Sequence, residues 1–104
     1  MTANQIVALN GRFVPIEEAS VPVLDRGFIF GDGIYEVVPV YGGKPFRFAD
    51  HMARLERSLT EMRMTNPLTR EKWHELATSL IAHHEAFMRA EGATADQLVY
   101  FQIT

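Results

Sequence analysis

Short apolar runs alternate with glycine-containing turns in the first half of the chain. Residues 5–16 form two such runs separated by Asn10-Gly11, a pair that tolerates the positive φ angles of a type I′ turn. Residues 34–48 repeat the arrangement around Gly42-Gly43, with β-branched and aromatic residues before the turn. The pattern therefore predicts two β-hairpins.

In the second half of the chain the apolar residues recur at helical spacing. The first stripe consists of Met52, Leu55, Leu59 and Met62. It predicts a helix over about 50–63 with Asp50 as the N-cap. A longer stripe predicts a second helix over about 69–90, capped by Thr69. Residues 93–96 form a short linker, and residues 97–104 have the composition of a strand, inside which the chain stops.

These elements predict an α+β fold in which two helices pack on an antiparallel sheet. The 104 residues correspond to one domain or part of one. Residues 17–33 lack a clear period and are expected to form an extended loop. Because the backbone of an apolar strand needs neighbours, we expect the last strand to lie at a sheet edge or the chain to be truncated within it.

Composition and charge narrow the classes of function. The chain is 47% hydrophobic and carries a net charge of -3, so it is globular and offers no broad basic surface to nucleic acid. It has no cysteine, which excludes disulfides and thiolate chemistry and favours the cytoplasm. No apolar run approaches the roughly 20 residues that span a bilayer, and no membrane partner is expected.

The densest group of chemically active residues lies in residues 25–36. Three glycines, at positions 27, 31 and 33, allow the backbone to approach a ligand closely, and polar side chains surround the same bend. The glycine spacing and the strand that follows exclude a dinucleotide-binding fingerprint. The alternative interpretation is an ordinary glycine-bearing loop that leads into a strand.

A second candidate lies on the first predicted helix, where His51, Arg54 and Ser58 share one border of the apolar face. An arginine half-buried at this border can bind phosphate or carboxylate through two nitrogens. The alternative is that Arg54 covers the rim of the core or pairs with Asp50. The lysines, Lys44 and Lys72, are expected to be exposed, and the histidine spacing indicates no metal site.

Four segments carry a family resemblance: Val7 to Val14, Asp25-Arg26-Gly27-Phe28-x-Phe30-Gly31-Asp32-Gly33-x-Tyr35-Glu36, His51-x-x-Arg54-Leu55-x-x-Ser58, and Tyr100-x-Gln102-x-Thr104. In this order, over essentially the whole chain, they resemble the N-terminal domain of fold-type IV pyridoxal-phosphate enzymes. That group includes D-amino-acid aminotransferases, branched-chain aminotransferases and aminodeoxychorismate lyases. The closing segment looks most like the D-amino-acid aminotransferases.

The resemblance implies a role for individual residues. Arg54 matches the arginine that binds the 5′-phosphate of pyridoxal phosphate, and Tyr35 matches the tyrosine that helps to hold the substrate carboxylate. Glu36 and His51 match residues of the polar network near the cofactor. The resemblance also implies a homodimer that acts on an amino acid and a 2-oxo acid.

The catalytic Schiff-base lysine of the family lies in a larger second domain, which these 104 residues do not include. Residues 1–104 are therefore expected to be a small N-terminal domain without a catalytic residue of its own, inactive when isolated. The substrate-binding arginine that follows the Gln-x-Thr segment in similar sequences is also absent. Another hypothesis is that the short chain is a non-catalytic dimerisation module.

Overall fold

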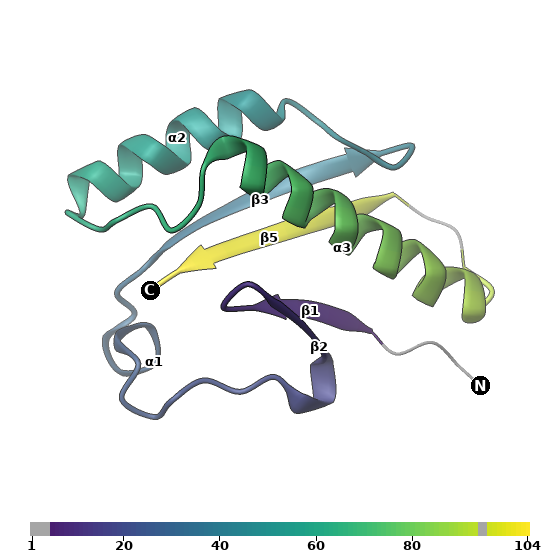
Figure 1. Ribbon diagram of the computed structural model, residues 1–104, viewed down its shortest axis with the longest axis horizontal. Coiled ribbons are helices and arrows are strands. Elements are labelled where there is room, and N and C mark those ends of the chain that lie inside the picture. The colour runs from purple at the N-terminus through teal and green to yellow at the C-terminus, as the bar shows by residue number, and fades with distance from the viewer. Residues whose placement is uncertain (1–4, 94–95) are drawn as a thin grey trace.

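The computed structural model describes residues 5–93 and 96–104 (Figure 1). These residues form a three-stranded antiparallel sheet, which helices cover, and a separate two-stranded hairpin. The predicted α+β class with antiparallel strands is confirmed. Residues 94–95, in the linker predicted before the last strand, lie outside the described residues. Among the described segments, none of the helices combines the length and the apolar composition that a membrane span needs.

The first predicted hairpin is confirmed. Strands β1 (Ile6–Leu9) and β2 (Arg12–Pro15) pair antiparallel. Asn10 and Gly11, between them, have φ angles of 52° and 79°. Both angles lie in the left-handed region that a type I′ turn requires, which explains why this pair occupies the turn.

The second hairpin leads into a separate three-stranded sheet. Strand β3 (Ile34–Tyr41) lies in the middle, between β4 (Lys44–Pro45) and β5 (Gln97–Ile103). The return strand β4 is shorter than predicted, because the chain turns into a helix soon after it. Strand β3 pairs with β5 along most of its length, but with β4 only at Val40 and Tyr41.

The two predicted helices are present as α2 (Phe48–Glu61) and α3 (Arg70–Ala90). Thr69 caps α3 as predicted, since its side chain accepts a hydrogen bond from the backbone of Lys72. The prediction that Asp50 caps α2 is wrong. Arg47 occupies that position with a φ of 54°. Asp50 instead lies in the first turn, where its negative charge is favourable.

The loop predicted over residues 17–33 contains two short helical segments, which corrects that prediction. A 3-10 turn, η1 (Ile16–Glu18), follows β2, and a helix of five residues, α1 (Arg26–Phe30), precedes β3. The side chain of Asp25 caps α1, and Gly31 ends it with a φ of 70°. A segment this short has no amphipathic period, so its helix could not be recognised from hydrophobic spacing.

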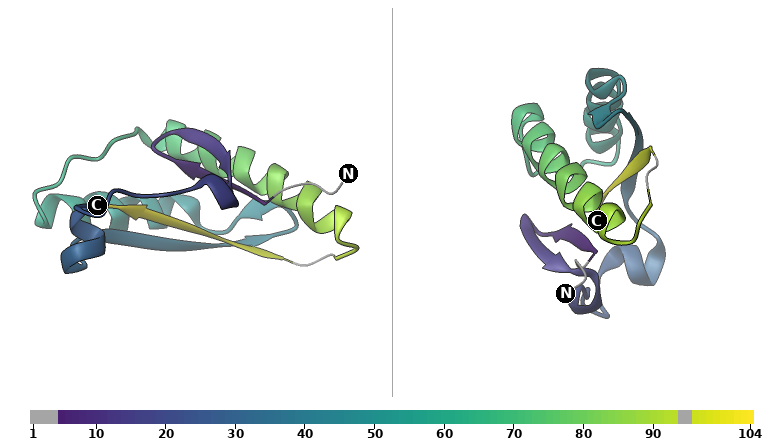
Figure 2. Two further views of the ribbon diagram at one scale, coloured as in Figure 1. Left: turned by 90° about the horizontal axis from the view of Figure 1, so that it is seen from below. Right: turned by 90° about the vertical axis from the view of Figure 1, so that its right-hand side faces the viewer.

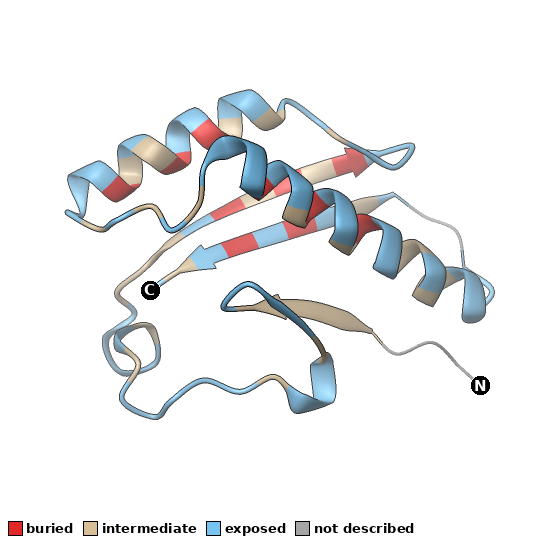
Figure 3. Ribbon diagram, viewed as in Figure 1, coloured by how far each residue is buried: buried red, intermediate tan, exposed pale blue. Residues whose placement is uncertain are grey.

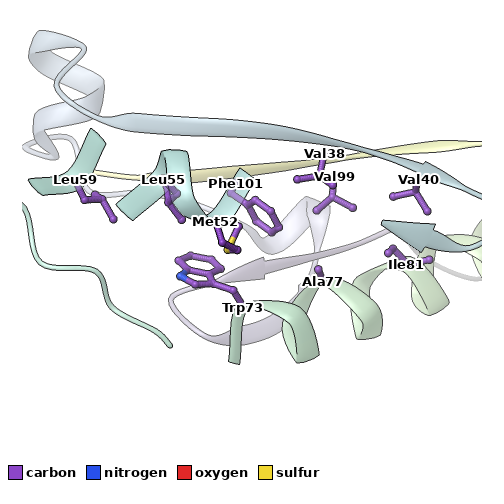
Figure 4. Close-up of a cluster of buried hydrophobic side chains, with 10 residues drawn as sticks. All are labelled: Val38, Val40, Met52, Leu55, Leu59, Trp73, Ala77, Ile81, Val99 and Phe101. Atoms are coloured by element: carbon purple, nitrogen blue, oxygen red, sulfur yellow. The ribbon is translucent and has the colours of Figure 1, made fainter. Parts of the chain in front are cut away.

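The core lies between the β3–β5 sheet and the two long helices (Figure 3). Its buried side chains come from both layers and are shown in Figure 4: Val38, Val40, Met52, Leu55, Leu59, Trp73, Ala77, Ile81, Val99 and Phe101. Leu55 is completely buried. The helical stripes identified in the sequence therefore face the sheet, as predicted, with one exception. Met62, the last residue of the first predicted stripe, follows the end of α2 and is 47% exposed.

Both long helices lie on the same face of the sheet, and the β1–β2 hairpin lies beside α3 (Figure 2). Alternate residues of β3 show this arrangement directly, because Val38 and Val40 are buried whereas Tyr35 and Tyr41 on the other face are exposed. The second face of the sheet is uncovered by the described residues and carries exposed aromatic side chains.

Candidate functional site

Neighbouring residues of β3 direct their side chains to opposite faces of the sheet. Tyr35 is 63% exposed on the uncovered face, whereas Glu36 is only 5% exposed on the face that packs against α2. This follows from the two-residue period of a strand, which places Glu36 in line with Val38 and Val40. A carboxylate in such a position requires polar partners from the helix that covers it.

Arg54 of α2 supplies the main partner of that carboxylate. Its Nε donates to Glu36 Oε2 and its Nη2 donates to Glu36 Oε1, each over 2.8 Å. The expected alternative, an ion pair between Arg54 and Asp50, is not formed, because Asp50 accepts from Arg47 Nε at 2.8 Å. The side chain of Arg54 is 56% exposed.

His51 completes the group around Glu36. Its Nδ1 lies 2.8 Å from Glu36 Oε1. We assign the proton to Nδ1, because an ionised carboxylate can only accept a hydrogen bond. The distance of 3.4 Å between Nδ1 and Arg54 Nη2 then joins two donors and is not a hydrogen bond.

The charges of this group reinforce one another. Hydrogen bonds from Arg54 lower the pKa of Glu36 below its ordinary value, against the opposing effect of burial, and the hydrogen bond from His51 lowers it further. In return, the carboxylate of Glu36 raises the pKa of Arg54. Glu36 is therefore a carboxylate, and Arg54 a cation, at neutral pH.

A shallow cleft of about 470 Å³ lies next to this group, between β3 and α2. It is lined by Gly33, Ile34, Tyr35, Glu36, Val37, Arg54 and Ser58. Strand β4 does not extend along this part of β3. The free edge of β3 therefore presents backbone groups to the cleft. As predicted, Arg54 and Ser58 lie on the same border of the helix.

Arg54 has donors left for a ligand in this cleft. Its bonds to Glu36 use Nε and one hydrogen of Nη2. Within the described residues, Nη1 makes no hydrogen bond to protein. A guanidinium with one edge occupied and Nη1 free can bind an anion such as phosphate.

Tyr35 belongs to a second group on the uncovered face of the sheet. Its ring stacks on Tyr100 of β5 with 5.7 Å between centroids and 16° between planes. The hydroxyl of Tyr100 donates to Gln102 Oε1 at 2.9 Å. The structure thus brings Glu36, His51 and Arg54 together and places the Tyr35 side chain on the other face of the same strand.

The glycine-containing segment before β3 packs against the end of β5. Thr104 Oγ1 donates to Asp25 Oδ2 at 3.1 Å, and a side chain at Gly27 would collide with Thr104. Arg26 and Asp32 form an exposed ion pair across α1 at 2.8 Å. Residue 104 is therefore held beside the segment that leads into β3 (Figure 1).

Two features of the site go beyond what the sequence analysis predicts. The resemblance places Glu36 only in a network near the cofactor, although alternation with Val38 and Val40 puts it on the buried face. The stacking of Tyr100 on Tyr35 depends on the register between β3 and β5, in which Tyr35 is opposite Gln102. Nothing local in the sequence indicates that register.

The lysines lie outside the cleft. Lys44 is exposed next to the turn after β3, and the Lys72 side chain is 66% exposed near the start of α3. Lys72 approaches Glu75 at 3.5 Å. The exposure of both lysines agrees with the prediction. Neither of them lines the cleft beside Arg54.

Comparison with known proteins places this chain in a family. A sequence model of "Amino-transferase class IV" matches residues 33–96. D-alanine aminotransferase of Listeria monocytogenes serotype 1/2a (strain 10403S) is 40% identical over 78 residues, which cover 75% of this chain and 27% of the relative. D-alanine aminotransferase of Staphylococcus aureus (strain N315) is 43% identical over 75 residues, or 72% of this chain and 27% of the relative.

The fold is similar to that of a solved aminotransferase. The branched-chain aminotransferase from the thermophilic archaeon Thermoproteus uzoniensis, solved with norvaline, superimposes with a TM-score of 0.66 and 33% identity over 92% of this chain and 31% of that one. The chain belongs to the class IV aminotransferase family. It spans a little over a quarter of the length of the curated relatives it matches.

Proposed function

We propose that this chain is the N-terminal domain of a transaminase that uses pyridoxal 5′-phosphate to move an amino group between a D-amino acid and a 2-oxo acid. The similarity to two D-alanine aminotransferases supports the substrate class. The observation that carries the proposal is Arg54, whose guanidinium lines a cleft and has Nη1 free among the described residues.

The donors in the cleft suit the phosphate group of this cofactor. A phosphate takes several hydrogen bonds and favours the flat, two-pronged guanidinium of arginine. Arg54 offers Nη1, Ser58, which carries a hydroxyl, lines the same cleft, and the free edge of β3 adds backbone groups. Arg54 would bind the phosphate, with Glu36 and His51 behind it.

The cofactor would supply the reactive group for amino transfer, because it acts as an electron sink when it is bound. The contribution of this chain is then to anchor the phosphate and to orient the substrate. Tyr35, at the start of β3, can donate a hydrogen bond from its hydroxyl to the substrate carboxylate. Its stacking on Tyr100 holds the ring in place for that role.

The remaining parts of the enzyme lie outside this chain. The lysine that binds the cofactor would come from a second domain, since Lys44 and Lys72 are exposed away from the cleft. Because the uncovered face of the sheet exposes aromatic side chains, it requires a covering surface. We propose that the whole enzyme is a homodimer and that it works in the cytoplasm.

A branched-chain aminotransferase is the second candidate function. The similarity of this fold to the enzyme of Thermoproteus uzoniensis favours it. The two candidates differ in the amino donor, so the full-length enzyme should be assayed with D-alanine and with L-leucine. Amino transfer from D-alanine supports the first candidate, and transfer from L-leucine alone supports the second.

Binding measurements on the full-length enzyme test the role of Arg54. A charge-assisted, two-pronged bond is worth roughly 1.5 to 3 kcal/mol, so Arg54→Ala should weaken pyridoxal 5′-phosphate binding by about one to two decades. Pyridoxal, which lacks the phosphate, should bind both proteins equally. Arg57→Ala is the matched control, because Arg57 is an exposed arginine on the same helix outside the cleft.

The outcome separates the two roles considered for Arg54. If Arg54 only covers the rim of the core, Arg54→Ala lowers the melting temperature and leaves the affinity for the phosphorylated cofactor unchanged. That result would overturn the proposed phosphate site.

A further inference from the structure

Glu36 is the one buried charged residue among the described parts of the chain. Its place in β3 lies in line with Val38 and Val40, so an apolar side chain would continue the core at that position. Burial of a carboxylate is unfavourable unless it is paired and hydrogen-bonded. Both of its oxygens are satisfied, Oε1 by His51 and Arg54 and Oε2 by Arg54 alone.

Arg54 has little else to hold its guanidinium. More than half of its side chain is exposed, and a long exposed side chain samples many rotamers. The two bonds from Glu36 fix the plane of the guanidinium through Nε and Nη2. The Nη1 atom is left on the opposite side of the group from the carboxylate.

The carboxylate itself is badly suited to touch the phosphate. Both groups are anions, and they repel each other at close range. A guanidinium can nevertheless bind one anion on each of two edges, because it has five N–H donors in a plane. Glu36 and a phosphate can therefore share Arg54 without direct contact.

We propose that Glu36 is a positioning residue that acts on the phosphate only through Arg54, and that His51 fixes the orientation of its carboxylate. This inference rests on the proposed function, and it gives Glu36 a specific role within the polar network near the cofactor. The affinity for the phosphate then depends on the charge and shape of a side chain that the cofactor never touches.

The first experiment measures how Glu36→Gln changes binding of pyridoxal 5′-phosphate and of pyridoxal to the full-length apoenzyme. The neutral amide has one acceptor oxygen in place of two and cannot hold both nitrogens of Arg54. We expect the Kd for pyridoxal 5′-phosphate to rise about tenfold, while the Kd for pyridoxal stays within about twofold. A purely structural effect of the substitution would weaken the binding of both ligands to the same extent.

Glu56→Gln provides the matched control. Glu56 lies on α2, as Arg54 does, and it holds Arg70 through the same two nitrogens, Nε at 2.6 Å and Nη2 at 2.8 Å. This second carboxylate–arginine pair lies outside the cleft. Its loss should leave both affinities unchanged.

A double-mutant cycle tests whether Glu36 acts through Arg54. Lysine at position 54 keeps the charge but cannot bind a carboxylate through two nitrogens. In the Arg54→Lys background, Glu36→Gln should therefore change the Kd for pyridoxal 5′-phosphate less than about twofold. Fully additive effects would overturn the proposal, because Glu36 would then reach the cofactor by another route.

The possible failures are distinguishable. If Arg54→Ala leaves the affinity for the phosphorylated cofactor unchanged, the proposed function fails, and this inference fails with it. If Arg54→Ala weakens that affinity but Glu36→Gln does not, only the inference is overturned.

If Glu36→Gln does not fold, Glu36→Asp is the variant to measure, because it keeps the charge and moves it away from Arg54 by one methylene group. It should weaken the binding of pyridoxal 5′-phosphate several-fold relative to the binding of pyridoxal. An unchanged ratio of the two affinities would overturn the inference.

Discussion

Two adjacent residues of β3, Tyr35 and Glu36, lie in different environments. Tyr35 lies on the uncovered face of the sheet, stacked on Tyr100, and Glu36 lies on the covered face, bonded to Arg54. A single strand can therefore supply one side chain to orient a substrate and another to support a phosphate site. Its two-residue period keeps these tasks apart.

Tyr35→Phe tests the first of these roles in the full-length enzyme. The change keeps the ring and its stacking and removes one hydrogen bond, worth about 0.5 to 1.5 kcal/mol, or up to 3 with a charged partner. We expect kcat/KM to fall roughly three- to a hundredfold, with an unchanged cofactor spectrum.

Tyr41→Phe is the control for this change, because Tyr41 is exposed on the same face at the other end of β3. It should leave kcat/KM as it is. If Tyr35→Phe also leaves kcat/KM unchanged for every accepted amino donor, Tyr35 is an aromatic residue of the sheet surface and does not bind substrate.

Glu36 also makes stability depend on pH. Its pKa is lowered in the folded chain, mainly by hydrogen bonds from Arg54. The unfolded chain therefore binds more protons in the acid range, and the stabilisation is complete above the ordinary pKa of about 4.5 and is lost as the pH falls through the folded value. Melting temperatures should show the advantage of the wild type over Glu36→Gln at pH 7 shrinking steadily below about pH 4.5. A constant difference would contradict this prediction.

At the scale of elements, α2 joins the core to the cleft. Its apolar stripe, Met52, Leu55 and Leu59, is buried against the sheet. His51, Arg54 and Ser58 each precede one of these residues, so they lie about 100° around the helix along the border of the stripe. Packing of the stripe therefore determines how close Arg54 comes to Glu36.

Leu55→Ala tests the contribution of this packing. Leu55 is completely buried, and truncation of such a leucine costs about 2 to 5 kcal/mol, depending on how far the cavity collapses. Urea unfolding of the 104-residue chain, followed by the fluorescence of its single tryptophan, Trp73, measures the loss. Met62→Ala at the exposed end of the helix is the control and should change stability by less than about 1 kcal/mol.

On the scale of the whole molecule, the sheet is covered on one side only. Tyr35, Tyr41, Leu98 and Tyr100 are exposed on its other face. The described chain therefore has a core between the helices and one side of the sheet (Figure 2). Tyr35 is exposed on the other side. This asymmetry agrees with the proposal that catalysis requires further polypeptide.

The isolated 104-residue chain should accordingly show no transaminase activity. Treatment with pyridoxal 5′-phosphate followed by borohydride should give no single stoichiometric adduct, because Lys44 and Lys72 are both exposed and lie away from the cleft. Mass spectrometry of the reduced protein measures the adduct, and the full-length enzyme serves as the positive control. One specifically labelled lysine in the short chain would contradict the prediction.

The elements of this fold could be predicted from the sequence because their signals are local. The turn at Asn10-Gly11 and the stripe beginning at Met52 depend on residues a few positions apart, and both appear where the pattern indicates. The resemblance also pointed to Glu36, His51 and Arg54, which the fold brings together. The start of α2 differs from the prediction, because the left-handed turn at Arg47, which has no glycine, leaves no compositional sign.

The site itself depends on contacts between elements that are distant in the sequence. Glu36 meets His51 and Arg54 across 15 and 18 residues of chain, and these contacts require β3 and α2 to pack in one register. The same packing turns Glu36 inward as the support of Arg54 and separates it from Tyr35. The two hairpins, the two long helices and the last strand, with the candidate residues that they carry, could be predicted because they depend on residue type and local spacing. The partner of each charge depends on distances through space, and these arise only when the sheet and the helices share a core.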